Sequence, residues 1–162
     1  MSDTKSSATF DLVLERDVRH RAIDVWRCWT DPTLLVKWFT PDPWRTTEAE
    51  IDLRPGGVFR TVMEGPDGER NEGSGCVLSA EPGKLFVWTS GLGPGFRPQD
   101  KPDGGFLFTA IIELEDLEEG SRIRATGRHA NQEDARQHEE MGFHAGWGAA
   151  LDQLLDVIDG KR

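Results

Sequence analysis

The sequence predicts an α+β fold in which a curved antiparallel sheet of about seven strands wraps around a long C-terminal helix, with two short helices after the first strand. Two patterns predict it. Beyond residue 44, apolar residues recur mostly at every second position, which is typical of strands, and beyond residue 131 they recur at helical spacing. A length of 162 residues suits a single domain. We expect that domain over residues 9–160, after a disordered tail at residues 1–8.

The expected elements follow one another without an internal repeat. They are a strand at 9–17, helices at 22–29 and 32–39, strands at 48–53, 58–64, 69–80, 84–90, 104–115 and 121–128, and a helix at 132–159. In the first helix, Trp26 and Trp29 share a face, and we interpret both as scaffold that packs the end of the sheet. Asp31 suits a helix N-cap and Pro32 the first helical position, so they predict the start of the second helix.

Glycine and proline mark the irregular parts of the predicted fold. Gly73 and Gly75 lie inside a strand and predict a bulge or sharp bend that curls the sheet. Residues 91–105 are rich in glycine and proline, and a loop of that length in a compact domain is typical of a mobile flap. The final helix carries an apolar stripe of His144, Trp147, Leu151, Leu154 and Ile158, which we expect to face the sheet.

Composition narrows the class of protein. The formal charge of −10 disfavours binding to nucleic acid or to anionic membranes. The sequence lacks an apolar run of about 20 residues and a secretory N-terminus, so we expect a soluble, cytoplasmic protein. Cys28 and Cys76 have no metal-like spacing and are expected to be reduced and buried. The histidine spacings also lack the i, i+4 pair typical of helical zinc sites, and neither a metal nor a cofactor is predicted.

Four segments carry a resemblance to a known family. Ala22–Pro32, Lys37–Pro41, Asp52–Phe59 and Gly146–Leu154 resemble the activator of heat-shock-protein-90 ATPase homologue family. This family belongs to the START and birch-pollen-allergen superfamily (SRPBCC), which also includes polyketide cyclases. The resemblance implies a helix-grip fold with a hydrophobic ligand cavity. It does not assign a ligand, because one fold supports many functions.

The predicted function is binding of a small apolar or aromatic ligand in that cavity. Trp38 and Trp44 flank prolines at the expected mouth of the cavity. The aromatic residues of the predicted strands alternate onto the inward face of the sheet, so we expect them to line the cavity as well. The predicted ligand-binding residues are Trp38, Phe39, Trp44, Arg60, Trp88, Phe106, Phe108, His144 and Trp147. One alternative is a cyclase- or hydrolase-type enzyme with His144 and Glu72 as the catalytic candidates. Another is a regulator of a chaperone ATPase, and a homodimer formed through a sheet edge or the Trp44 region is also open.

Overall fold

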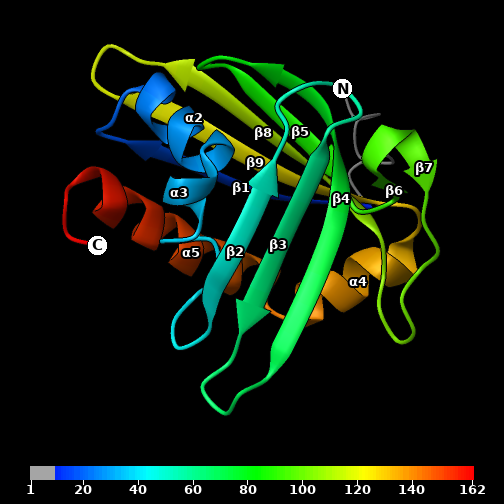
Figure 1. Ribbon diagram of the computed structural model, residues 1–162. Coiled ribbons are helices and arrows are strands. Elements are labelled where there is room, and N and C mark those ends of the chain that lie inside the picture. Colours follow the sequence, from blue (N-terminus) through cyan, green and yellow to red (C-terminus); the bar gives the residue numbers. More distant parts are fainter. Residues whose placement is uncertain (1–9) are drawn as a thin grey trace.

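The computed structural model describes residues 10–162, and its main feature is a seven-stranded antiparallel sheet. The number of strands and their antiparallel pairing match the predicted sheet, and the strand order is β1-β9-β8-β5-β4-β3-β2 (Figure 1). The strands are β1 (Asp11–Val18), β2 (Arg45–Ile51), β3 (Val58–Glu64), β4 (Arg70–Glu81), β5 (Leu85–Thr89), β8 (Phe108–Asp116) and β9 (Ser121–His129). The disordered tail predicted at residues 1–8 and the strand start predicted at Thr9 lie outside the described residues.

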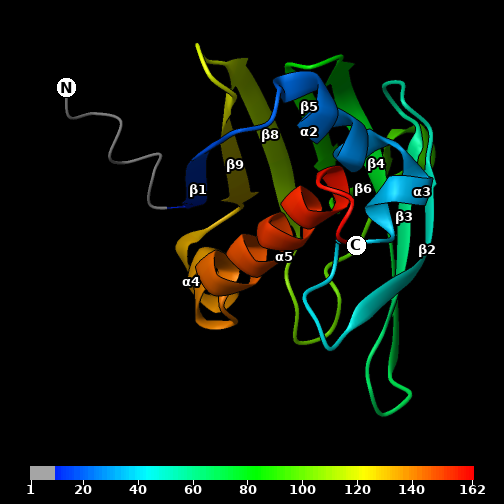
Figure 2. The same cartoon turned by 90° about the vertical axis from the view of Figure 1, so that its left-hand side faces the viewer.

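The helices occupy the concave side and both ends of the sheet. They are α2 (Ala22–Thr30), α3 (Pro32–Leu35), α4 (Gln132–Glu140) and α5 (Phe143–Ile158). Figure 2 shows α5 inside the curve of the sheet, with α2 and α3 closing the end where the C-terminus lies. This is the predicted helix-grip arrangement. None of the helices in the described part of the chain is long and apolar enough to cross a membrane.

The single C-terminal helix predicted at 132–159 is wrong, because two helices occupy that segment. Asn131 caps α4, accepting a hydrogen bond of 2.8 Å from the main-chain N–H of Asp134. Gly142 then adopts a φ of +95°, a left-handed conformation that interrupts a right-handed helix and favours glycine. The break sets the direction of α5 and brings α4 across one end of the sheet (Figure 2).

The segment 91–105, predicted as a flap, contains regular structure in its first half. A two-stranded sheet of β6 (Leu92–Gly93) and β7 (Arg97–Pro98) flanks a short 3-10 turn, η1 (Pro94–Phe96). The main-chain N–H of Gly95 donates to the oxygen of Gly56 at 2.7 Å and ties this segment to the turn before β3. These backbone bonds were not predictable from the glycine and proline content.

The predicted irregularity of β4 exists, but at another position. Gly73 and Gly75 pair regularly with Thr61 and Phe59 of β3. The register instead shifts against β5 between Val77 and Ser79. Gly75 has a different role: a Cβ atom there would clash with the main-chain oxygen of Thr89, so the two backbones approach too closely for any side chain.

Two tryptophans anchor the short helices. Trp26 Nε1 donates a hydrogen bond of 3.0 Å to the main-chain oxygen of Leu85, which joins α2 to β5. Trp38 Nε1 donates at the same distance to the oxygen of Cys28 and holds the chain after α3 against α2. A buried indole thereby satisfies its one donor while its rings fill the core. Cys28 and Cys76 are both free and buried, and burial raises the pKa of the Cys28 thiol to about 11.

Candidate functional site

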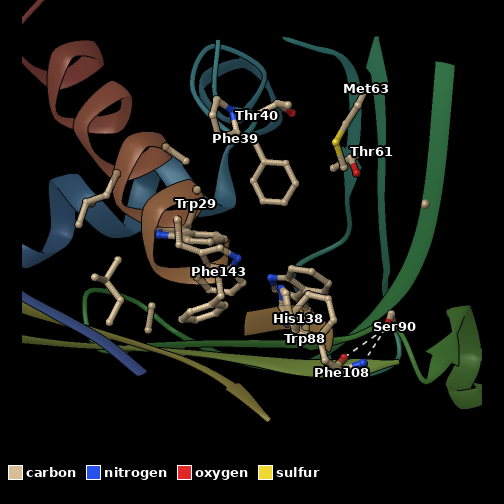
Figure 3. Close-up of a pocket in the computed structure, with 18 of the residues that line it drawn as sticks. Trp29, Phe39, Thr40, Thr61, Met63, Trp88, Ser90, Phe108, His138 and Phe143 are labelled. Atoms are coloured by element: carbon tan, nitrogen blue, oxygen red, sulfur yellow. Dashed lines mark hydrogen bonds between the residues drawn. The ribbon is translucent and has the colours of Figure 1, made fainter. Parts of the chain in front are cut away.

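A cavity of about 470 Å³ lies between α5 and the concave face of the sheet. Figure 3 shows side chains from the sheet, the helices and the segment after α3 converging on it. Its aromatic lining consists of Trp29, Trp38, Phe39, Phe59, Trp88, Phe106, Phe108, Phe143 and Trp147. The polar side chains in the lining are those of Thr40, Thr61, Ser74, Ser90 and His138. No Asp, Glu, Lys or Arg of the described residues lines it. The site can therefore bury a largely apolar, uncharged molecule.

Strand alternation places the aromatic walls. Phe59 and Thr61 of β3 face inward, as do Trp88 of β5 and Phe108 of β8. The ring of Phe59 stacks on that of Trp88 with centroids 4.3 Å apart and planes at 17°. Phe108 meets Trp88 edge-on at 5.4 Å. These contacts preform the apolar surface before any ligand arrives.

Six of the nine residues predicted to bind a ligand line the cavity. They are Trp38, Phe39, Trp88, Phe106, Phe108 and Trp147. Trp29 lines it as well, although we expected it only as scaffold. Its ring meets that of Trp38 edge-on at 4.7 Å, so one wall of the cavity is continuous with the core. Trp26 remains scaffold, outside the lining.

The predicted inward position of Arg60 is wrong. Because Phe59 and Thr61 point into the cavity, period-two alternation sends Arg60 to the convex face of the sheet. There Arg60 forms ion pairs with Glu72 at 2.7 Å and Glu48 at 3.2 Å. The hydrogen bond from Arg60 lowers the pKa of Glu72 below its usual value, which keeps this exposed carboxylate ionised. Glu72 thus lies outside the cavity as a partner of Arg60.

Trp44 does not reach the cavity either. It directly precedes β2, the edge strand, and lies over the turn that joins β3 to β4. A Cβ atom on Gly65 in that turn would lie 2.9 Å from Cε2 of the Trp44 ring. The side chain is half-buried there and is not part of the cavity lining. The prolines that flank the predicted mouth gave no information about where the Trp44 side chain points.

His144 is exposed, contrary to the predicted apolar stripe. Because α5 begins at Phe143, that residue takes the first inward position of the helix and is 2% exposed. The inward stripe continues through Trp147, Ala150 and Leu154. His144 lies on the flank of that stripe, in the first turn, and is absent from the cavity lining.

The histidine that does line the cavity is His138 of α4, which the sequence prediction missed. His138 and His129, at the end of β9, are 7% and 6% exposed. His129 Nε2 and His138 Nδ1 lie 2.8 Å apart. Two signals in the sequence could have found them: His129 continues the inward alternation of Ile123 and Ala125, and His138 lies three residues after the buried Ala135.

The electrostatics of this pair keep His138 neutral. Burial, together with the nearby His129, lowers the pKa of His138 from its usual 6.5 to about 4. No positively charged side chain among the described residues lines the cavity to oppose a negative ligand charge. Met141 also lines the cavity and is 70% exposed, so the mouth of the cavity lies at this residue.

Comparison with known sequences identifies one family. The family profile described as Activator of Hsp90 ATPase homolog 1-like protein matches residues 19–159. A search of curated protein sequences gave no match.

Comparison with solved structures gives the same architecture. A protein from Nitrosomonas europaea shares 41% identity with a TM-score of 0.89, over 95% of this chain and 97% of that chain. A protein from Mycobacterium smegmatis shares 27% identity with a TM-score of 0.74, over 91% and 90%. An AHSA1 protein from Silicibacter pomeroyi has a TM-score of 0.67 at 22% identity, over 94% and 99%, and shows the common fold alone.

Proposed function

Since the chain belongs to the family of Activator of Hsp90 ATPase homolog 1-like proteins, we propose that it binds a small apolar or aromatic molecule in the cavity between α5 and the sheet. The observation that carries the proposal is an uncharged, aromatic-lined cavity of about 470 Å³. That volume lies within the range of roughly 300–1,000 Å³ of small-molecule sites. Burial of about 200 Å² of apolar ligand surface would contribute ~5 kcal/mol before the costs of association.

The binding experiment uses the full chain and a panel of two- and three-ring aromatic compounds, beginning with naphthalene. We expect saturable quenching of tryptophan fluorescence and an increase in Tm, since a ligand that binds only the folded state stabilises it. A panel that moves neither signal at millimolar or solubility-limited concentration would refute the proposal.

A matched pair of variants locates the binding. Trp147→Ala removes a ring that lines the cavity, whereas Trp44→Ala removes a half-buried ring outside it. The proposal expects Trp147→Ala to weaken binding by tenfold or more and Trp44→Ala to leave it unchanged. Equal losses in both variants would mean that the ligand does not occupy this cavity.

Two alternatives have less support. The enzyme hypothesis relied on His144 with Glu72, but His144 is exposed and Glu72 is ion-paired on the convex face. The chaperone hypothesis rests on the family description alone, and a pull-down with the host's chaperone, with its ATPase measured, tests it directly. Dimerisation and the cytoplasmic location stay predictions.

A further inference from the structure

The histidine pair beside the cavity has a fixed direction of hydrogen bonding. His129 Nδ1 lies 2.9 Å from the main-chain oxygen of Phe10. A carbonyl oxygen only accepts, so the proton of this bond belongs to His129 Nδ1. In a neutral imidazole the other nitrogen is then an acceptor. His129 Nε2 consequently accepts a hydrogen bond from His138 Nδ1, at 2.8 Å.

These two hydrogen bonds determine which group His138 presents to a ligand. With its proton on Nδ1, neutral His138 carries an unshared electron pair on Nε2. Among the residues that the structure describes, Nε2 has no hydrogen-bond partner, yet it is not among the fully enclosed atoms without one. Since His138 lines the cavity, Nε2 remains within reach of a molecule there. The His138 ring lies against that of Phe108, with centroids 4.8 Å apart (Figure 3).

The His138 ring is surrounded mainly by other aromatic rings. The rings of Phe106, Phe108 and Phe143 have centroids within 5.1 Å of the His138 ring. An acceptor in such surroundings favours a partner that donates a proton and disfavours a second lone pair, because an unpaired polar contact away from water is costly.

We propose that the ligand carries a neutral hydrogen-bond donor, of which a phenolic or alcoholic hydroxyl is the simplest, and that this group donates to His138 Nε2. The inference rests on the proposed function and names the ligand class: aromatic alcohols are favoured and carboxylates are excluded. A carboxylate has no proton to donate near neutral pH, and the cavity offers it no cation.

The test compares four probes of similar shape with the wild-type chain by isothermal titration calorimetry at pH 7. They are naphthalene, 2-methoxynaphthalene, 2-naphthol and 2-naphthoate. We expect 2-naphthol to bind about five- to tenfold more tightly than 2-methoxynaphthalene, which keeps the oxygen but lacks its proton, and 2-naphthoate to bind most weakly. Equal affinity of the methoxy and hydroxyl compounds, or a preference for 2-naphthoate, would overturn the inference while naphthalene binding still supports the proposed function. Failure of all four would refute both.

A second measurement does not depend on any ligand. Nitrogen-15 NMR of the imidazole rings reports which nitrogen carries the proton, and we expect His138 to be protonated at Nδ1. A proton on Nε2 would overturn the inference whatever the probes do.

A variant pair tests the residue itself. His138→Phe keeps a ring but removes the acceptor, and we expect it to abolish the preference for 2-naphthol over 2-methoxynaphthalene while naphthalene still binds. His144→Phe, on the exposed flank of α5, should keep that preference. A preference that survives in folded His138→Phe would contradict the inference. If that variant does not fold, the probe comparison and the NMR measurement on wild type decide the matter.

Discussion

Gln153 of α5 donates a hydrogen bond of 3.0 Å from Nε2 to the main-chain oxygen of Trp38. The same Nε2 donates to the oxygen of Thr40 at 2.9 Å, and Oε1 accepts from the N–H of Asp42, also at 2.9 Å. One buried amide thereby connects the helix to the irregular segment after α3. Because Trp38 and Thr40 line the cavity, this connection also fixes one of its walls.

We expect Gln153→Ala to lower the free energy of unfolding by about 2–4 kcal/mol, since it leaves three main-chain groups without their partner. Urea unfolding measures the loss. Gln137→Ala is the matched control, because Gln137 makes one hydrogen bond, to the oxygen of the exposed Gly104, and should cost less than about 1 kcal/mol. Similar losses in the two variants would show that the Gln153 network contributes little.

The neutral His138 predicts a pH dependence of stability. Its pKa is about 4 in the folded protein and near 6.5 in an unfolded chain. Between these values the unfolded chain binds the proton and the folded protein does not, so stability falls as the pH drops below 6.5. This residue should account for a loss of about 2 kcal/mol between pH 7 and pH 5.

Urea midpoints at pH 5, 6 and 7 measure that slope. His138→Phe should flatten it, and His144→Phe should keep the wild-type slope. A His138→Phe protein that loses stability as steeply as wild type over this range would assign the dependence to other groups.

Two glycines of β4 predict opposite outcomes for the same substitution. Gly75→Ala should be strongly destabilising, by more than about 2 kcal/mol, because its Cβ would meet the main-chain oxygen of Thr89, which cannot move without parting β4 from β5. At Gly73 a Cβ would meet nothing within 4 Å. Gly73→Ala should therefore be neutral or stabilising by up to about 1 kcal/mol. Thermal melts of both proteins test this, and a tolerated Gly75→Ala would contradict the close approach.

Trp26→Phe tests the anchor between α2 and β5. The substitution removes the donor to the oxygen of Leu85 and part of a buried ring, so we expect a loss of about 2–3 kcal/mol. Ligand binding should stay unchanged, because Trp26 does not line the cavity. A change in naphthalene affinity at constant fold would show that the scaffold and the binding wall are not separable.

The existence of about seven strands and their positions along the chain were predictable because alternation and turn residues are local signals. The family resemblance then indicated how the helices close on the sheet. What could not be predicted depends on geometry between elements. To predict which face Arg60 occupies, the register of β3 must be known. To predict where Trp44 lies, the path of the chain into β2 must be known. His144 was misplaced because a single residue, Gly142, changes where the helical face begins.

The contact between His129 and His138 could not be predicted from the sequence for the same reason. Each residue has a local signal of burial, but their contact depends on how α4 crosses the end of β9 after the turn at Asn131. Spacing along the chain excluded a helical zinc pair and contained no information about a hydrogen bond between a strand and a helix.

The break at Gly142 also has a kinetic consequence. Because the left-handed residue separates α4 from α5, the helix that carries His138 and leads to the mouth at Met141 is a hydrogen-bonded unit of its own. Its amide protons should exchange with solvent independently of those of α5, whose inward face is packed in the core.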